Sequence, residues 1–380
     1  MKRLNFILGL LVLLFACCED DYNFDPNFTA PTELTSPKSV KIDVSSTIPL
    51  TFSWSGGGAA DGGIVLYKVL FDKADGDFTN PIAEMKGDLG AEPQLTITQS
   101  ELNTIARKSG IKPDETGVLK WTVIASKGGD TKNCTETAQI TVTRGEGIDN
   151  IPSELYLFGS ATENGAENGQ KFREVSEGVF CIYSKLSSGD FVFRSSNSND
   201  GFSYFVDDKG KLREGDTNMP ASPSDDISRI TVDFNSLSMK IDHIGQDVRC
   251  IWGATYNNIA VCSYIGNGKF VGDGDIKFVQ QSRPETMPPS WLSWVEERYY
   301  FIAKVNGADV CWGRGDDVSP ERPTGGEPLS FYQLHEFGWS QWDHLWKMSG
   351  SLDMQHATIT IDTNLDNMMV HTFTNLSPIN

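Results

Sequence analysis

Two stretches of the chain carry one pattern: Ile230–Ile241 reads ITVDFNSLSMKI, and Ile359–Val370 reads ITIDTNLDNMMV. Each begins with apolar residues at alternate positions, continues through a polar turn and ends in a second apolar stretch. Alternation with a period of two is typical of a half-buried β-strand, and two such runs around a turn predict a hairpin. The return of the hairpin after 129 residues (359 − 230) indicates that one β-sandwich module occurs twice.

Two shorter segments are repeated between the same parts of the chain. Leu155–Ser160 and Cys250–Ala254 both place an aromatic residue before a glycine and a small residue. Gly189–Phe193 and Gly274–Phe278 both begin with Gly-Asp and end in phenylalanine. These matches extend the repeat beyond the hairpin to most of each module.

The two modules differ in length. We place module one at residues 151–244 and module two at residues 246–380. The Gly-Asp match is offset by 85 residues (274 − 189) and the hairpin by 129, so module two has 44 additional residues between these points. These additional residues predict an insert at about residues 279–350 of module two. The insert contains six tryptophans, whereas module one contains none.

Residues 31–145 also consist of short segments of alternating polarity. Leu50–Trp54 and Leu119–Ile124 place apolar residues on one face, and this alternation assigns the tryptophans of both segments to the core. A short helix is expected from Ser100, which we take as its N-cap. Strands at this spacing in about a hundred residues predict an immunoglobulin-like or fibronectin-like sandwich.

The first residues of the chain have the composition of a secretory signal. Two basic residues precede an apolar run that is too short to be a durable membrane-spanning helix. Leu14–Cys17 reads LFAC and has the form of a lipobox. We therefore expect a signal peptide at residues 1–16 and a tether at residues 17–30, lipidated at Cys17. The alternative is an ordinary signal peptide cut near Ala16, with an incidental thiol after it.

Acidic residues outnumber basic ones in this chain. It has 51 Asp and Glu against 32 Lys and Arg, a formal net charge of −19. Loss of residues 1–16 removes two positive charges and gives −21. Phosphate binding requires clustered Lys and Arg, so the charge argues against nucleic acid as a partner. It fits a self-repelling surface protein and is more compatible with a neutral glycan than with an anionic one.

No sequence motif indicates catalysis, a metal or a cofactor, and we expect none of the three. The chain lacks C-x-x-C pairs, zinc spacing of histidines, a P-loop, a dinucleotide fingerprint and a serine-hydrolase elbow. Gly272–Asp275 (GDGD) is interpreted as a turn. The cysteines after Cys17 are expected mostly as buried thiols, although Cys250 and Cys262 could face each other across a hairpin. A glycosidase, which needs two carboxylates at a set separation, is the third functional alternative.

Several motifs of the first sandwich occur together in one known family. A strand ending in tryptophan is followed by Tyr67-x-Val-x-Phe71-Asp72 and Gly76-Asp77-Phe78, then by Leu102-Asn103 and Gly117-x-Leu-x-Trp-Thr-Val-x-Ala125. Together they resemble the N-terminal domain of the SusE/SusF outer-membrane lipoproteins of Bacteroidetes polysaccharide-utilisation systems. The resemblance covers roughly residues 31–145.

This resemblance implies an all-β fold: an N-terminal immunoglobulin/fibronectin-like sandwich, followed by two repeated carbohydrate-binding-module-like β-sandwiches. It implies an outer-membrane location through the lipid anchor at Cys17, and the acidic run Glu19–Asp21 resembles the signal for the cell surface. It further implies non-catalytic binding of a neutral oligosaccharide or polysaccharide, with uptake through a SusC/SusD-like transporter complex. The alternative is a scaffold or accessory subunit of the same surface complex that binds no glycan.

The insert offers the aromatic rings and hydrogen-bonding side chains that a sugar-binding face requires. The candidate glycan-binding residues are Trp291, Trp294, Trp339, Trp342, Gln341 and Asp343. The first two, three residues apart, would share one side of a helical turn after Pro289. Trp312 and Trp346 are expected in the core. Module one offers only Phe202 and Tyr204 in its corresponding loop, which we interpret as solvated.

Overall fold

The chain divides into two compact units, residues 1–145 and 146–380. The computed structural model describes residues 25–379, apart from 146, 199, 316–321 and 339–343. The expected signal peptide and Cys17 therefore lie outside the described residues. The all-β prediction is confirmed, because strands form nearly all the regular structure and the described residues contain a single α-helix.

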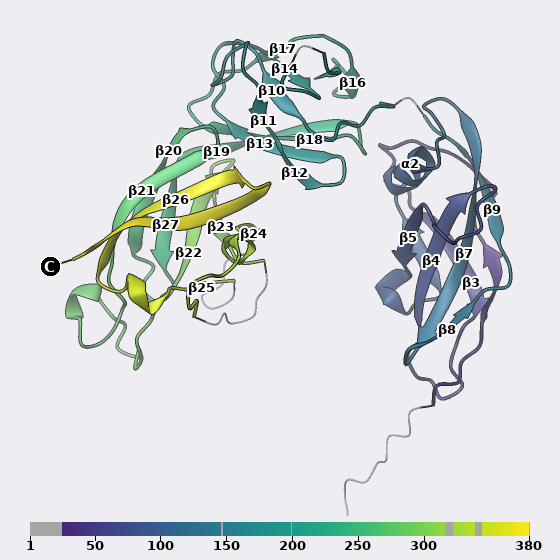
Figure 1. The fold of residues 1–380 in the computed structure, drawn as a ribbon, viewed down its shortest axis with the longest axis horizontal. Helices are drawn as coiled ribbons and strands as arrows, with labels where there is room; N and C mark the ends of the chain where they lie inside the picture. The colour runs from purple at the N-terminus through teal and green to yellow at the C-terminus, as the bar shows by residue number, and fades with distance from the viewer. Residues whose placement is uncertain (1–24, 146, 199, 316–321, 339–343, 380) are drawn as a thin grey trace, which may run out of the picture. The chain divides into compact units, whose positions relative to one another are not determined.

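Unit one is a sandwich of two sheets and one helix (Figure 1). Its elements are β1 (Pro31–Thr35), β2 (Ser39–Lys41), β3 (Leu50–Gly56), β4 (Leu66–Lys73), β5 (Ala83–Lys86), the 3₁₀ turn η1 (Asp88–Gly90), β6 (Gln94–Ile97), α2 (Gln99–Lys108), β7 (Thr116–Lys127), β8 (Asp130–Asn133) and β9 (Ala138–Thr143). One sheet has the order β1-β3-β6, and the other has the order β2-β9-β7-β4-β5 with β8 on β7.

The core of unit one lies between these sheets, as the alternation predicts. Phe52 of β3 meets Phe71 of β4 and Trp121 of β7 edge to face, each with ring centroids 5.2 Å apart. Trp54 and Trp121 are buried, in agreement with their assignment to the core. Edge-to-face packing is a favourable arrangement of aromatic quadrupoles.

The N-cap of α2 differs from the expectation. The cap is Thr98, whose hydroxyl oxygen accepts a hydrogen bond from the Glu101 backbone N–H at 3.1 Å, while the Glu101 carboxylate accepts one from the Thr98 N–H at 2.7 Å. This reciprocal capping box satisfies two backbone donors. Ser100 lies inside the helix, so the prediction that it caps the helix was wrong.

Unit two contains the repeated hairpins. Its elements are β10 (Tyr156–Phe158), β11 (Gln170–Lys171), β12 (Arg173–Ser176), β13 (Val179–Ser184), β14 (Gly189–Arg194), β15 (Ser203–Val206), β16 (Leu212–Glu214), β17 (Met219–Ala221), β18 (Ile227–Asp233), β19 (Ser238–Trp252), β20 (Asn258–Gly266), β21 (Lys269–Ile276), η2 (Pro284–Thr286), β22 (Arg298–Val305), β23 (Ala308–Gly313), η3 (Leu329–Tyr332), β24 (His335–Phe337), β25 (Trp346–Lys347), η4 (Gly350–Leu352), β26 (Gln355–Leu365) and β27 (Met368–Pro378). The repeated sequences form the hairpins β18–β19 and β26–β27.

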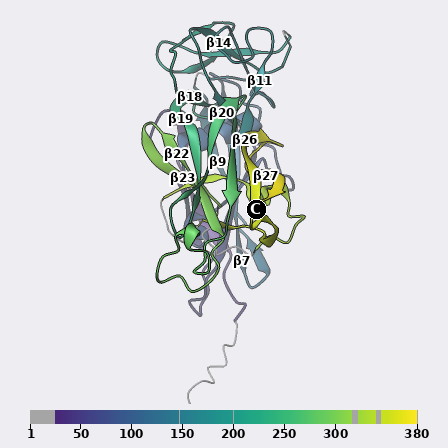
Figure 2. The same ribbon diagram turned by 90° about the vertical axis from the view of Figure 1, so that its left-hand side faces the viewer.

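Strand pairing in unit two is itself repeated. The order β12-β13-β18-β19 is followed, in the same sheet, by β20-β21-β26-β27 (Figure 2 shows β18, β19, β20 and β26). The remaining strands repeat as well: β14 pairs with β10, β15 and β17, and β22 pairs with β19, β23 and β25. Strand β19 runs without a break through Gly245, where the sequence places the module boundary, so its two ends serve different modules.

The strand registers correct one sequence match. Val179 pairs with Asp233 and Lys269 pairs with Asp362, so β13 corresponds to β21 at an offset of 90 residues (269 − 179). Strand β14, which contains Gly189–Phe193, corresponds in its pairing to β22. The match of Gly189–Phe193 with Gly274–Phe278 was therefore wrong, because a Gly-Asp dipeptide is too short to fix a register. The additional residues of module two consequently fall both before and after β22.

The segment Gly272–Asp275 lies inside β21. The prediction that it forms a turn was therefore wrong. A Cβ atom on Gly272 would lie 2.2 Å from the Val261 carbonyl oxygen of β20, and one on Gly274 would lie 2.3 Å from that of Ile259. The glycines therefore allow a close approach of two strands.

All five cysteines of the described residues are buried free thiols: Cys134, Cys181, Cys250, Cys262 and Cys311. Cys262 of β20 pairs with Val248, and Cys250 of β19 pairs with Ala260, so the two thiols are not directly opposed. Burial raises the pKa of Cys262 to about 12 and that of Cys250 well above its ordinary value. They are therefore protonated at neutral pH and contribute to packing.

Candidate functional site

The loop between β21 and β22 carries the first pair of candidate tryptophans. An antiparallel bridge closes its base, with Val279 N–H donating to the Glu296 carbonyl at 3.0 Å and Glu296 N–H donating to the Val279 carbonyl at 2.8 Å. Leu292 is buried and anchors the loop in the core. Arg283 forms an ion pair of 2.6 Å with Asp353, just before β26. The loop is thus held by backbone, apolar and ionic contacts.

Trp291 and Trp294 lie side by side at the surface of this loop. Their ring centroids are 5.9 Å apart, and the ring planes are inclined by 48°. The side chains are 48% and 46% exposed, respectively. The backbone forms a single turn, in which the Leu292 N–H donates to the Pro289 carbonyl, and does not continue as a helix. The structure therefore brings the two rings together, as the spacing indicated, on a turn.

Glu296 fixes the orientation of one of these rings. The Trp294 indole N–H donates to Glu296 Oε2 at 2.7 Å. The same buried carboxylate accepts two hydrogen bonds from the Arg298 guanidinium, each 2.6 Å long. Such charge-assisted bonds are strong and geometrically specific. Trp294 is thereby held with its polar edge satisfied inside the protein while part of its apolar ring faces solvent.

The remaining candidates of the insert lie outside the described residues: Trp339, Gln341, Trp342 and Asp343. The expectation that Trp312 and Trp346 belong to the core agrees with their complete burial. Trp346 lies against Tyr299 with ring centroids 5.7 Å apart and donates its indole N–H to the Phe331 carbonyl at 2.8 Å. Neither ring is exposed at the outer surface of the protein.

The corresponding loop of module one has no aromatic pair. Tyr204 is fully buried and donates its hydroxyl hydrogen to the Asn150 carbonyl at 2.8 Å. Phe202 is exposed and makes no ring contact with another aromatic residue among the described residues. Tyr204 therefore belongs to the core strand β15 and not to a solvated loop, and Phe202 remains as the exposed ring of this segment.

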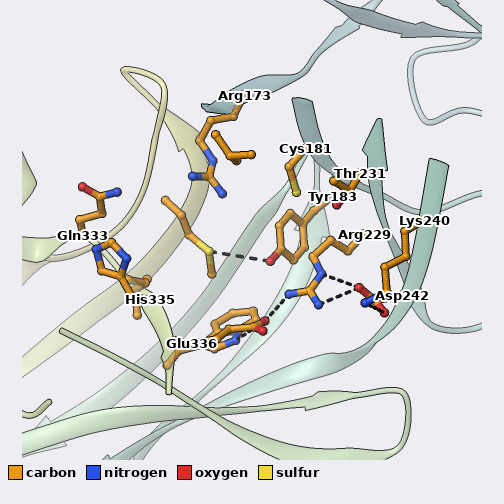
Figure 3. A pocket seen from close by; sticks show the side chains of 14 residues that line it. Arg173, Cys181, Tyr183, Arg229, Thr231, Lys240, Asp242, Gln333, His335 and Glu336 are labelled. Carbon is orange, nitrogen blue, oxygen red and sulfur yellow. Dashed lines mark hydrogen bonds and ion pairs between the residues drawn. The ribbon is translucent and has the colours of Figure 1, made fainter. Parts of the chain in front are cut away.

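A second concave site, which the sequence did not reveal, lies within unit two where the modules meet (Figure 3). It encloses about 400 Å³. Its lining residues are Arg173, Val175, Cys181, Tyr183, Arg229, Thr231, Lys240, Asp242, Trp312, Gln333, Leu334, His335, Glu336 and Met369. We call it the junction pocket, because β12, β13, β18 and β19 supply one wall and β23, β24 and β27 supply the other.

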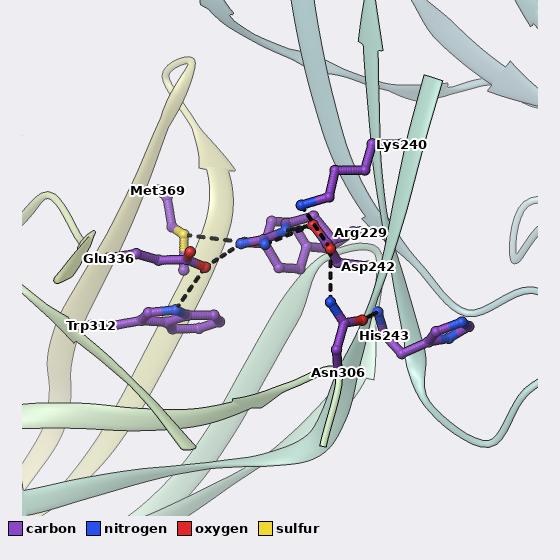
Figure 4. Close-up of polar contacts among 9 residues, drawn as sticks. Arg229, Lys240, Asp242, His243, Asn306, Trp312, Glu336 and Met369 are labelled. Carbon is purple, nitrogen blue, oxygen red and sulfur yellow. Dashed lines mark hydrogen bonds and ion pairs between the residues drawn. The ribbon is translucent and has the colours of Figure 1, made fainter. Parts of the chain in front are cut away.

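Arg229 connects the two walls of the junction pocket (Figure 4). Its guanidinium forms an ion pair of 2.8 Å with Asp242 of β19 and a second one with Glu336 of β24. Glu336 also accepts the indole N–H of Trp312 at 3.2 Å. Asn306 donates its side-chain N–H to Asp242 at 2.9 Å. Both carboxylates are therefore occupied by donors from the protein.

Burial disfavours the ionised form of Asp242, but the hydrogen bonds that its carboxylate accepts outweigh this effect. Hydrogen bonds from Asn306, Arg229 and Lys240 lower the pKa of Asp242 to about 2. Asp242 is thus ionised throughout the neutral range and keeps the Arg229 guanidinium in place.

Arg173 has a different environment on the other side of the junction pocket. Its Nε is buried and has no hydrogen-bond partner among the described residues. Figure 3 shows its guanidinium extending from β12 into the pocket. A buried donor without a partner is rare in proteins, and a bound water or ion is one explanation for it.

Two further properties concern the described part of the chain. It contains no group of three or more His, Cys, Asp or Glu side chains placed to hold a metal ion. None of its helices is both long and apolar enough to cross a bilayer.

The fold and its sites define an all-β protein of sandwich modules with one exposed aromatic pair and one polar junction pocket. Residues 19–124 match the model of the family described as SusE outer membrane protein. This match covers less than a third of the chain and supports a SusE-type protein of the outer membrane. No curated protein matches the chain.

Proposed function

We propose that this SusE-type protein binds a neutral oligosaccharide or polysaccharide without cleaving it, through the surface formed by Trp291 and Trp294. The supporting observation is the adjacent pair of half-exposed indoles, one of which is fixed by Glu296. The axial C–H groups of a sugar form an apolar patch that stacks on such rings. A preoriented ring loses little conformational entropy on binding.

The loop also provides polar groups for the hydroxyls of the sugar. Ser290 and Ser293 are exposed next to the tryptophans in sequence. Hydroxyl side chains donate and accept hydrogen bonds with sugar hydroxyls. We further propose that Trp339, Trp342, Gln341 and Asp343 contribute to the same activity. Each such contact gains little net free energy in water, so the affinity for one sugar chain is modest.

The proposal places the protein beside a SusC/SusD-like transporter complex, to which it presents glycan for uptake. It includes a lipid anchor on Cys17 that follows removal of a signal peptide. A Cys17→Ala variant tests the anchor, because it should no longer take up radiolabelled palmitate or partition with the membrane fraction. Continued labelling of the variant would contradict it.

The glycan proposal is tested by calorimetry of the full chain against a panel of neutral oligosaccharides. Trp291→Ala and Trp294→Ala should each weaken binding about 2- to 13-fold, because an aromatic contact contributes about 0.5–1.5 kcal/mol. Phe202→Ala is the matched control, since it removes an equally exposed ring, 48% accessible, from module one. It should leave the affinity unchanged.

Two results would contradict this proposal. Equal loss of affinity in Phe202→Ala would show that the tryptophan loop is not the site. Absence of binding to every glycan of the panel would favour the alternative, a scaffold or accessory subunit of the same complex. Release of reducing ends from any glycan would contradict the non-catalytic part.

A further inference from the structure

The junction pocket has an excess of positive charge in a strongly acidic protein. Its lining includes three cationic side chains and two anionic ones, whereas the chain as a whole has a formal net charge of −19. The two anions, Asp242 and Glu336, are both paired with Arg229. The lining thus carries one net positive charge (3 − 2), and Arg173 and Lys240 are the cations outside the Arg229 ion pairs.

Of these two, Arg173 is the one placed to bind a ligand. Lys240 forms an ion pair of 3.0 Å with Asp242, and its side chain is 71% exposed. Among the described residues Arg173 forms no ion pair, and its Nε is buried without an acceptor. A guanidinium fork matches the two oxygens of a carboxylate better than any neutral group.

The other side chains that line the junction pocket suit a sugar ring, which has apolar C–H faces and hydroxyl groups at its edge. Val175, Leu334 and Met369 supply apolar surface, and Thr231 and Gln333 supply hydrogen-bonding groups. The volume of about 400 Å³ lies within the range of ligand sites, roughly 300–1,000 Å³. A sugar ring with a carboxylate substituent combines these properties.

We propose that the junction pocket binds a uronic acid residue of an acidic oligosaccharide, with its carboxylate on Arg173. The inference rests on the proposed glycan-binding function. It adds to the protein a second glycan site, which takes an acidic sugar and not a neutral one. Neutral sugars bind at the tryptophan pair, and uronic acid residues bind in the junction pocket. A neutral sugar in this pocket leaves the Arg173 Nε–H without an anionic acceptor.

The experiment measures binding of tri-galacturonate and of its neutral counterpart galactotriose to the full chain by calorimetry. The wild-type protein should bind tri-galacturonate, and Arg173→Met should weaken this binding at least 10-fold. Arg173→Lys keeps the positive charge but not the planar guanidinium fork. Its affinity for tri-galacturonate should therefore fall less than that of Arg173→Met. Both variants should unfold at the wild-type temperature, because the Nε lacks a protein acceptor. Should Arg173→Met fail to fold, Arg173→Lys still tests the planar fork, and wild-type affinity of this variant for tri-galacturonate would overturn the proposed carboxylate contact.

The two proposals fail in different ways. A Trp291→Ala, Trp294→Ala double variant should keep its affinity for tri-galacturonate, whereas Arg173→Met should keep its affinity for neutral oligosaccharides. Wild-type affinity of Arg173→Met for tri-galacturonate would overturn the junction-pocket proposal and leave the tryptophan site untouched. Absence of wild-type binding to tri-galacturonate at millimolar concentration would also overturn it.

Discussion

Trp294 and Glu296 are joined by a hydrogen bond of 2.7 Å from the indole N–H to Oε2, and the carboxylate that accepts it is buried. Arg298 donates to the same carboxylate. Glu296→Gln removes the charge and leaves one acceptor oxygen for all these donors. We expect it to lower the free energy of unfolding by about 1–3 kcal/mol, as for other bonds to charged groups. Urea unfolding measures this change.

The matched control for this substitution is Glu285→Gln, at an exposed position of the same loop. It should change the stability by less than about 0.5 kcal/mol. Glu296→Gln should also weaken glycan binding, because Trp294 loses its fixed orientation. A Glu296→Gln protein as stable as the wild type would show that the buried carboxylate does not hold the loop.

The tryptophans of module two should separate into two classes by their effect on stability. Trp312 is fully buried against Tyr183 and Phe270, so Trp312→Ala should cost about 3–5 kcal/mol. Trp291 is about half exposed, and Trp291→Ala should cost less than about 1 kcal/mol. Thermal unfolding of the two variants provides the comparison. Similar losses in both would assign Trp291 to the core and remove it from the proposed glycan surface.

Local patterns were sufficient to predict the sandwich of unit one and the hairpins of unit two. Alternation places Phe52 and Trp121 on inner faces, and burial of alternate residues is a property of each strand alone. The Gly-Asp match failed because it rested on two residues, whereas the true correspondence is defined by pairing, such as Val179 with Asp233. Pairing depends on long-range register, which a short motif does not contain.

The junction pocket illustrates what the sequence could not reveal. Arg229 and Thr231 alternate with buried Ile230 and Val232, so the pattern indicates a solvent-facing side of β18. In the structure that side is covered by Glu336, from a segment more than a hundred residues later in the chain. Such a contact between modules leaves no periodic signal. The exposed tryptophan pair, in contrast, was recognisable from its spacing and its proline-rich surroundings.

Ionised Asp242 should stabilise the folded protein, and this contribution should be lost at acid pH. Its folded-state pKa of about 2 lies below the ordinary value of 3.8, so the unfolded chain takes up a proton first as the pH falls. The contribution is present above pH 3.8 and is lost as the pH falls through about 2. It amounts to roughly 2 kcal/mol, since one pKa unit corresponds to about 1.4 kcal/mol. Asp242→Asn should therefore be destabilised at pH 5 and approach the wild type near pH 2.

Denaturant unfolding at several pH values tests this dependence. Asp309→Asn is a suitable control, because Asp309 forms ion pairs with Arg249 and Lys304 on the surface, where such pairs contribute at most about 1 kcal/mol. A constant difference between Asp242→Asn and the wild type from pH 5 to pH 2 would contradict the role of its ionisation.

His371 should give the protein a second pH dependence, at higher pH. The side chain is fully buried. Its Nε2 lies 2.8 Å from the Tyr299 hydroxyl oxygen, and its Nδ1 lies 3.0 Å from the Tyr332 carbonyl oxygen. Burial lowers its pKa to about 3, although the bond to the carbonyl acts in the opposite direction. Between pH 6.5 and pH 3 the unfolded chain therefore binds a proton that the folded protein does not. Stability should fall progressively as the pH drops through this window, by several kcal/mol in total.

Replacement of this histidine separates the effect from other acid-sensitive groups. His371→Gln should be less stable than the wild type at pH 7, because its cavity and hydrogen bonds are tailored to imidazole, but its stability should depend less on pH between 6.5 and 3. The same substitution at His243, which is exposed, should leave the wild-type slope in place. Hence the difference in free energy of unfolding between His371→Gln and the wild type should shrink as the pH falls. A difference that stays constant over this range would mean that His371 takes up its proton equally in both states, and that the buried aromatic cluster around it tolerates charge.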